Sequence, residues 1–283
     1  MINYQIFIPG GNKTALVLGL ETDAAHRKKI QDAIMQQHEH DVDGEVEQVG
    51  FISMEVEHPQ LVMAGGEFCG NATRAAAAYY LKEKNVQALS IRSSGCPYPL
   101  QAGYTQKGEV FAQMPLQSDL QSAVRELGDT GMFWVALEGI SHLVVSVQES
   151  AAYLAQIRQT EQKEETLKIA MDFLEHTIAE HQLNAGEAYG VMFLEEIEDR
   201  LHMHPFVYIK TSGTCYYETA CGSGTMCVGL VECFLSDWGN INLPLVQPSG
   251  QVISAIVEKK EALTGKIVGP VAIGATEKIR QVY

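Results

Sequence analysis

The sequence is poor in positive charge and in long apolar runs, and each shortage excludes a class of protein. It has 20 Lys and Arg against 35 Asp and Glu, for a formal net charge of −15. Nucleic acids and anionic membrane surfaces are bound through clustered basic side chains, so we expect neither as a partner. Apolar runs such as residues 133–137 are far too short to span a bilayer, and the start lacks a signal-peptide pattern. A cytoplasmic protein is therefore expected.

Motifs for nucleotides and metals are missing as well. Gly222-Ser223-Gly224 lacks the full glycine spacing of a dinucleotide site, and no phosphate-binding loop is present. Four of the six cysteines recur every six residues from Cys215 to Cys233, whereas structural zinc sites favour two to four residues between ligands. The histidine pairs at 38 and 40 and at 202 and 204 have no third ligand nearby in sequence, so we expect surface histidines. No metal site is predicted.

Length and patterning indicate two domains of mixed α and β structure. The 283 residues are 46% hydrophobic and 19% charged, which suits two soluble domains of moderate size. The first half predicts strands and turns around one alanine-rich helix at residues 71–81. The second half predicts further strands, a helix with one apolar face at residues 167–178, and a buried apolar helix at residues 222–235. We expect an α+β fold in which each domain is a strongly bent, barrel-like sheet around a central helix.

One internal similarity stands out. Cys69-Gly70-Asn71-Ala72-Thr73 matches Cys221-Gly222-Ser223-Gly224-Thr225, and each run follows strands and opens a predicted helix. A cysteine at a helix N-terminus lies beside unpaired N–H groups and the positive end of the helix dipole, which favour its thiolate. The glycine lets a ligand approach the backbone, and the N–H groups can hold a carboxylate.

Two such units supply what racemisation of an amino acid needs. One group must remove the α-proton while another delivers a proton to the opposite face, so a thiolate and a thiol work as a pair. The carbanion must be stabilised through its carboxylate by preorganised donors. The pattern therefore predicts Cys69 and Cys221 as catalytic groups. The other interpretation is that the match is a remnant of domain duplication and that both cysteines are merely buried.

The chain resembles the diaminopimelate epimerase superfamily of cofactor-independent isomerases. Asn12 resembles that family's N-terminal substrate-binding asparagine, and residues 67–71 and 220–224 resemble its two cysteine motifs. The resemblance spans the whole chain and implies two pseudo-symmetric domains, with the last strand returning to the first. It also implies an amino-acid substrate, no pyridoxal phosphate or other cofactor, no metal, and a homodimer. The implied domains are residues 1–116 with 270–283, and residues 117–269.

Two departures change the expected substrate. Diaminopimelate epimerases carry a Glu-Arg pair shortly before the second cysteine, and this chain has no Arg there. Residues 63–67 also lack the family's Asn-x-Asp-Gly. Because an Arg fork is the natural partner of a carboxylate, its absence argues against diaminopimelate. Residues 47–51, 67–73, 94–96 and 221–225 instead resemble the histidine racemase branch.

That resemblance assigns the remaining site residues. Glu47 would lie on a mobile loop at the mouth of the site, and Tyr217 and Glu218 would line the side-chain pocket; a solvated Glu and a packed Tyr are the alternatives. The α-amino acid end of the substrate would be held by Asn12 and the two helix starts, which contribute Gly70, Asn71, Gly222 and Ser223.

Four other functions stay open. Diaminopimelate epimerase itself, or a racemase of another amino acid, would use the same cysteines. A phenazine-pathway isomerase shares this fold but lacks the cysteine pair. A solute-binding module of the same fold would hold a carboxylate without exchanging its α-proton.

Overall fold

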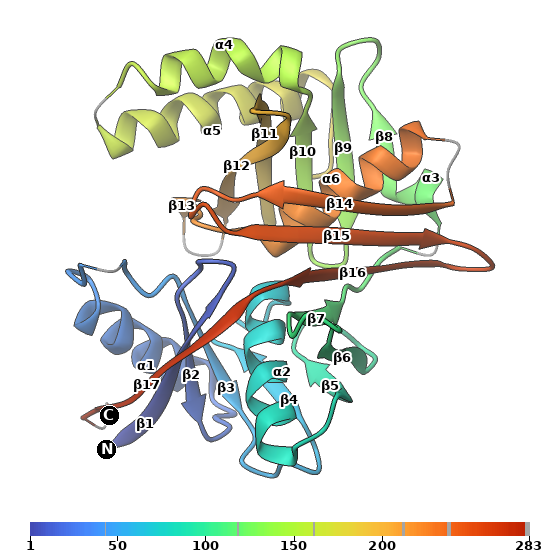
Figure 1. The fold of residues 1–283 in the computed structure, drawn as a ribbon. Helices are drawn as coiled ribbons and strands as arrows, with labels where there is room; N and C mark the ends of the chain where they lie inside the picture. The colour runs from blue at the N-terminus through green and yellow to red at the C-terminus, as the bar shows by residue number, and fades with distance from the viewer. Residues whose placement is uncertain (43, 118, 161, 211–212, 237–238, 281–283) are drawn as a thin grey trace. The chain divides into compact units, whose positions relative to one another are not determined.

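A computed structural model describes residues 1–280 apart from 43, 118, 161, 211–212 and 237–238 (Figure 1). The chain forms two compact units. Unit 1 comprises Met1–Met114 and Lys266–Tyr283, and unit 2 comprises Pro115–Gly265. Strands predominate and helices are few, so the predicted mixture of α and β structure is confirmed. Within the described residues, no helix is both long enough and apolar enough to cross a membrane.

Unit 1 is a curved run of strands. β1 pairs with β17 and β2, β2 with β3, β3 with β4, β4 with β5, β5 with β6, β6 with β7, and β7 with the end of β16. The chain passes from unit 2 into unit 1 within β16. The elements are β1 (Ile2–Pro9), β2 (Thr14–Leu18), α1 (Ala24–Gln37), β3 (Gln48–Ile52), β4 (Gln60–Met63), α2 (Gly70–Lys84), β5 (Ala88–Ser93), β6 (Leu100–Tyr104), β7 (Val110–Gln113), β16 (Leu263–Gly269) and β17 (Val271–Ile279).

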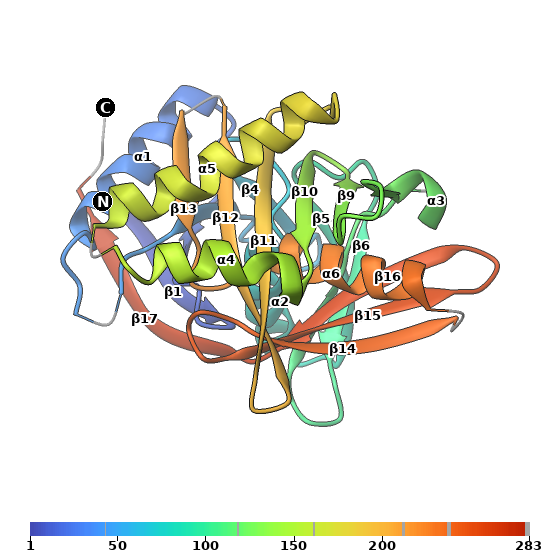
Figure 2. The same ribbon diagram turned by 90° about the horizontal axis from the view of Figure 1, so that it is seen from above.

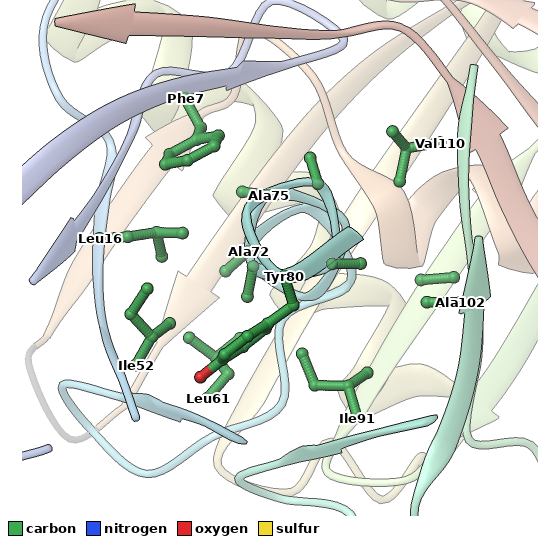
Figure 3. Packing of buried hydrophobic residues seen from close by; sticks show 14 of the residues in the cluster. Phe7, Leu16, Ile52, Leu61, Ala72, Ala75, Tyr80, Ile91, Ala102 and Val110 are labelled. Carbon is green, nitrogen blue, oxygen red and sulfur yellow. The ribbon is translucent and has the colours of Figure 1, made fainter. Parts of the chain in front are cut away.

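Helix α2 is the core of unit 1. Figure 3 shows it end-on, surrounded by side chains such as Phe7, Leu16, Ile91 and Val110 from the strands around it. Its alanines are buried on every side, because small side chains let strands approach a helix from all directions. The bent sheet around a central helix predicted for this part of the chain is therefore present.

Unit 2 contains a second buried helix and an additional pair of helices. Helix α6 contacts strands from β8 to β11 and also β14 and β15. Figures 1 and 2 show α4 and α5 side by side, and both contact β11. The elements are α3 (Leu120–Ala123), β8 (Val124–Glu126), β9 (Met132–Leu137), β10 (Ile140–Val145), α4 (Val147–Ile157), α5 (Lys163–Glu180), β11 (Ala188–Ile197), β12 (Arg200–Ile209), β13 (Thr214–Tyr217), α6 (Gly222–Leu235), β14 (Asn240–Val246) and β15 (Val252–Lys259).

The strands β10, β11 and β12 therefore have two distinct faces. Leu143, Phe193 and Phe206 belong to a buried cluster that includes Leu154 of α4 and Leu174 of α5. The alternate residues point the other way, since successive side chains on a strand face opposite sides. We call these the α5 face and the α6 face. Helix α5 also contacts β12 and β13.

The predicted helices at 71–81, 167–178 and 222–235 are confirmed as α2, α5 and α6. The expectation of a single helix in the first half was wrong, because α1 is present as well. Helix α1 is mostly polar and buries only Arg27, Ile30 and Ile34, so its apolar stripe is too narrow to show as a helical period. Helix α4 was also missed, and it buries only Ser150 and Leu154.

Candidate active site

Both cysteines of the repeat are N-caps. Cys69 precedes α2 with φ/ψ of −135°/117°, and Cys221 precedes α6 with −123°/111°. The Cys69 Sγ accepts the N–H of Ala72 at 3.4 Å, and the Cys221 Sγ accepts the N–H of Gly224 at 3.3 Å. The usual capping atom is an oxygen of Ser, Thr, Asp or Asn. Here a sulfur occupies that position, so each thiol lies at the positive end of a helix dipole.

The threonine four residues after each cysteine forms equivalent hydrogen bonds in the first turn of both helices. Thr73 Oγ1 donates to the Cys69 carbonyl at 2.7 Å, and Thr225 Oγ1 donates to the Cys221 carbonyl at 2.6 Å. The backbone N–H groups of these threonines reach the same carbonyls at 2.9 and 3.0 Å. The sequence repeat therefore encodes one local structure, a sulfur-capped helix start, in each unit.

The first turns of both helices are tightly packed. Gly70, Asn71 and Gly222 are buried, and Ser223 is half-buried. A Cβ on Gly70 would lie 3.0 Å from the side-chain ends of both Ile267 and Met114, so a larger residue would have to displace them.

A chain of side chains in unit 1 leads from Glu47 to Cys69. The Cys69 thiol donates to Gln48 Oε1 at 2.8 Å, and Gln48 Nε2 donates to Asn12 Oδ1 at 2.5 Å. Asn12 Nδ2 in turn donates to Glu47 Oε2 at 2.8 Å. Thr14 Oγ1 also donates to Asn12 Oδ1, so both amides are held in one orientation. The structure thus brings the predicted Asn12, Glu47 and Cys69 together, with Gln48 as the link.

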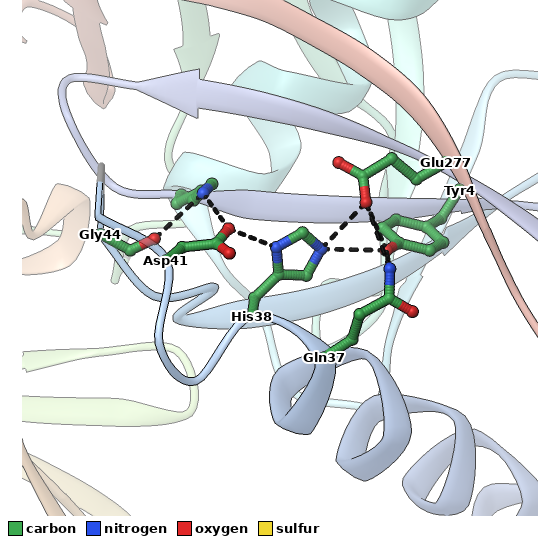
Figure 4. Close-up of polar contacts among 7 residues, drawn as sticks. Tyr4, Gln37, His38, Asp41, Gly44 and Glu277 are labelled. Atoms are coloured by element: carbon green, nitrogen blue, oxygen red, sulfur yellow. Dashed lines mark hydrogen bonds and ion pairs between the residues drawn. The ribbon is translucent and has the colours of Figure 1, made fainter.

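The segment between the end of α1 and Glu47 in the sequence makes several hydrogen bonds within a cluster of polar side chains (Figure 4). Asp41 accepts from Lys13 Nζ at 2.7 Å and lies 2.6 Å from Nδ1 of His38. The hydrogen bond from Lys13 is the main cause of an Asp41 pKa lowered to about 2. On its other side His38 meets Tyr4 Oη at 2.9 Å and Glu277 at 3.4 Å. The expectation that His38 lies on the surface was wrong, because its ring lies between Asp41 and Tyr4 and is 4% exposed.

Cys221 has an acidic neighbour. The residue is 2% exposed. Burial raises the pKa of its thiol well above the ordinary value, and the Glu218 carboxylate raises it further through its charge and a hydrogen bond. The hydroxyl of Ser223 and the N–H of Gly224 act in the opposite direction. Burial and Glu218 therefore favour the protonated thiol of Cys221, and the hydrogen bonds at the helix start offset this only in part.

His142 is a site neighbour that the sequence analysis missed. It lies fully buried on β10, and its Nε2 is 2.8 Å from Ser223 Oγ, which is 3.4 Å from Cys221 Sγ. Its buried Nδ1 has no hydrogen-bond partner within the described residues. Burial lowers the pKa of His142 to about 3, so the ring is neutral. We place its one N–H on Nε2, where it donates to Ser223, because an unpaired buried N–H is the rarer and costlier choice.

Gln247 is the second missed neighbour. It begins a turn of sequence Gln-Pro-Ser-Gly at residues 247–250, and its Oε1 accepts the N–H of Cys221 at 3.0 Å. Its Nε2 donates to Thr225 Oγ1 at 3.2 Å. The Ser249 N–H of the same turn donates to the Thr219 carbonyl at 3.0 Å. The turn therefore supports both sides of Cys221. A glutamine before a Pro-Ser-Gly turn was the available signal.

Tyr217 lies away from Cys221. Its ring stacks on Phe206, with centroids 4.7 Å apart, and its hydroxyl is 2.8 Å from His204 Nδ1. Both neighbours are on the α5 face, and burial raises the Tyr217 pKa to about 12. Tyr217 therefore faces away from the residues that surround Cys221 on the α6 face. His204, expected as a surface histidine, is half-buried, and its ring lies beside Tyr217 and Glu195.

No group of three or more His, Cys, Asp or Glu side chains is placed to hold a metal ion in the part of the chain that is described.

Comparison with known proteins gives consistent matches. A family model described as the histidine racemase CntK N-terminal domain matches residues 1–279. A histidine racemase of Fusobacterium nucleatum subsp. nucleatum is 29% identical over 282 residues, covering 96% of this chain and 93% of the relative. A histidine racemase of Staphylococcus aureus is 26% identical over 261 residues, covering 89% and 88%.

Solved structures show the same fold at low identity. A phenazine biosynthesis protein of the PhzF family from Bacillus anthracis has a TM-score of 0.62 at 15% identity and covers 99% of both chains. A probable proline racemase from Agrobacterium radiobacter K84 has a TM-score of 0.59 at 10% identity, covering 99% of this chain and 93% of its own. At these identities the likeness establishes the fold.

Proposed function

Because the chain belongs to the histidine racemase CntK family, whose model matches residues 1–279, we propose that it interconverts L- and D-histidine with Cys69 and Cys221 as proton-transfer groups. The family makes it an isomerase acting on an amino acid. The observation that supports the two-thiol mechanism is that both cysteines are helix N-caps whose sulfurs accept a backbone N–H.

In this mechanism one cysteine serves each face of the α-carbon. A thiolate takes the α-proton, and the S–H of the other cysteine gives a proton to the opposite face. The reverse reaction exchanges the roles. The N–H groups at Gly70, Asn71, Gly222 and Ser223 are the donors proposed for the substrate carboxylate, where negative charge develops as the carbanion forms. Asn12 assists at the amino acid end.

The side chains near each sulfur have different proposed roles. Glu218 favours the thiol form of Cys221, and Ser223, held by His142, directs a hydroxyl toward the sulfur. Glu47 and Glu218 are acidic groups that can hydrogen-bond an imidazole. A second carboxylate on the substrate would face these charges without an Arg to offset them, which disfavours diaminopimelate and glutamate.

We also propose that the protein is a homodimer and that it is located in the cytoplasm, as expected from the sequence.

The substrate is tested by incubating the protein with individual L-amino acids and meso-diaminopimelate in heavy water. Chiral chromatography then measures inversion, and mass spectrometry measures α-deuterium. We expect fast inversion of histidine and slow reaction of diaminopimelate and glutamate. Histidine remaining inert while another amino acid inverts would overturn the substrate. Tight binding of an amino acid without α-exchange would indicate the solute-binding module.

The mechanism is tested by Cys69→Ser and Cys221→Ser, with Cys227→Ser as control. Serine is a strong N-cap, so both helix starts should persist and thermal melting should change little. A hydroxyl is much harder to ionise than a thiol, so kcat should fall by about 10²- to 10⁴-fold. Cys227 is fully buried elsewhere on α6, and its variant should keep near-normal kcat. Near-normal turnover in either of the first two variants would refute the two-thiol mechanism.

A further inference from the structure

A row of side chains crosses unit 2 beside Cys221. His142 of β10 is in register with Gly190 of β11, Gly190 with Val207 of β12, and Val207 with Tyr216 of β13. Residues in register across a sheet point to the same face. His142 fixes which face this is, because its ring hydrogen-bonds Ser223 at the start of α6. Tyr216 therefore lies on the α6 face.

The neighbouring row of residues across the sheet contains Met192 and Pro205 and ends at Glu218, beside Cys221. The N–H of Glu218 donates to the carbonyl of Pro205, which is in register with Met192. A Cβ on Gly224 would lie 2.2 Å from Met192 Sδ, so the first turn of α6 sits directly over Met192. Glu218 thus stands on the α6 face, beside the sulfur whose pKa it raises.

Tyr216 and Glu218 border the same surface. They are two residues apart on one segment, so their Cα atoms are separated by about 7 Å if the extended backbone of β13 continues. The Tyr216 side chain is 37% exposed, whereas Val207 beside it is buried. Glycine and valine fill the row between His142 and Tyr216, so Tyr216 is the large side chain that ends it.

Tyr217 is as exposed as Tyr216, but its side chain lies on the opposite face of the sheet. It too is 37% exposed, but it stacks on Phe206 and hydrogen-bonds His204 on the α5 face. The chain therefore presents two adjacent tyrosines of equal exposure, one on each face of the sheet.

We propose, on the basis of the proposed function, that Tyr216 contacts the side chain of the bound amino acid and selects a flat aromatic ring. A phenol ring stacks well on an imidazole, and a protonated imidazole gains a cation–π attraction as well. Aliphatic and carboxylate side chains gain less from the same face. Glu218 then supplies the polar contact and Tyr216 the aromatic one. The phenol acts on binding of the side chain and takes no part in proton transfer.

The test compares Tyr216→Ala with Tyr217→Ala, and Tyr216→Phe with Tyr217→Phe. Steady-state kinetics with L-histidine give KM and kcat, α-deuterium exchange of L-alanine reports turnover of a small substrate, and thermal melting reports folding. We expect Tyr216→Ala to raise KM for histidine about ten-fold. Its kcat should stay within about two-fold, because an interaction shared by ground state and transition state is lost. Exchange of alanine should not change.

The control should behave differently. Tyr217→Ala should lower the melting temperature, because it removes the stack on Phe206, and should leave KM for histidine unchanged. Tyr216→Phe keeps the ring and should keep KM near the parent value; a rise equal to that of Tyr216→Ala would mean that the hydroxyl makes the contact.

An unchanged KM in Tyr216→Ala, a rise matched by Tyr217→Ala, or a loss confined to kcat would overturn the inference. Should the alanine variant fail to fold, Tyr216→Leu keeps a bulky apolar side chain without the aromatic face and is judged by the same KM criterion. If wild-type protein does not invert histidine at all, the proposed function fails instead. If it does invert histidine and Tyr216→Ala is normal, only this inference fails.

Discussion

Replacing His142 with Gln should make the protein less sensitive to acid. His142 is fully buried, and its pKa falls from 6.5 to about 3 because burial disfavours the charged ring. Above pH 6.5 the ring is neutral in both folded and unfolded chains, so its contribution to stability is complete there. As the pH falls from 6.5 toward 3, the unfolded chain takes up a proton that the folded chain refuses. Stability is therefore lost across this window.

The size of the loss follows from the pKa difference. Each pH unit in the window costs about 1.4 kcal/mol, so one histidine removes about 2 kcal/mol between pH 6.5 and pH 5. Folded domains are typically stable by about 5–15 kcal/mol, so a loss of this size is readily measured. Glutamine cannot take up this proton and reaches about as far as Nε2, so it can still donate to Ser223.

The assay is urea unfolding of wild type, His142→Gln and His176→Gln at pH 7.5, 6, 5.5 and 5. His176 lies on α5 with its side chain 80% exposed, and its replacement controls for removing one histidine from the unfolded chain. The difference in unfolding free energy between wild type and His142→Gln should shift by about 2 kcal/mol from pH 7.5 to pH 5 in favour of the variant. An acid dependence in His142→Gln equal to that of wild type would refute the assignment of a neutral, buried imidazole.

Two further predictions concern the same half of the protein. Gly190→Ala should lower the unfolding free energy by about 1–3 kcal/mol, because its Cβ would lie 2.3 Å from the Phe206 carbonyl oxygen; an unchanged urea midpoint would contradict this. Glu218→Gln should lower the pKa of the Cys221 thiol, because it removes the carboxylate that raises it. Alkylation of Cys221 by iodoacetamide, followed by peptide mass spectrometry, should then begin at lower pH than in wild type, and an unshifted profile would rule out the electrostatic role of Glu218.

Local sequence was sufficient to predict the two helix starts. The Cys-Gly-x-x-Thr pattern specifies its own cap, because the sulfur, the third backbone N–H and the threonine hydroxyl all lie within five residues. The helices that follow were also predictable, since alanine-rich and uncharged segments of that length are typical of buried helices. Asn12 and Glu47 came from the family resemblance, and the structure places both in contact with each other.

Residues that strand pairing brings to the site could not be predicted from the sequence. His142 is a polar residue within the otherwise mostly apolar strand β10, and only the pairing of β10 with β11 and the position of α6 bring it to Ser223. The choice between Tyr216 and Tyr217 has the same origin. Adjacent residues on a strand face opposite sides, and a shift of one residue in register would exchange them. Composition and periodicity carry no information about that register.

The two sulfurs share a backbone environment and differ in the side chains that face them. The cap N–H groups at 3.4 and 3.3 Å give both cysteines a similar pull toward the thiolate. Cys69 meets the neutral amide oxygen of Gln48, whereas Cys221 meets the carboxylate of Glu218. A racemase needs its two groups in opposite protonation states at the start of each turnover. In the proposed two-thiol mechanism, the carboxylate beside Cys221 favours its protonated form before substrate reacts, and each turnover exchanges the roles of the two sulfurs.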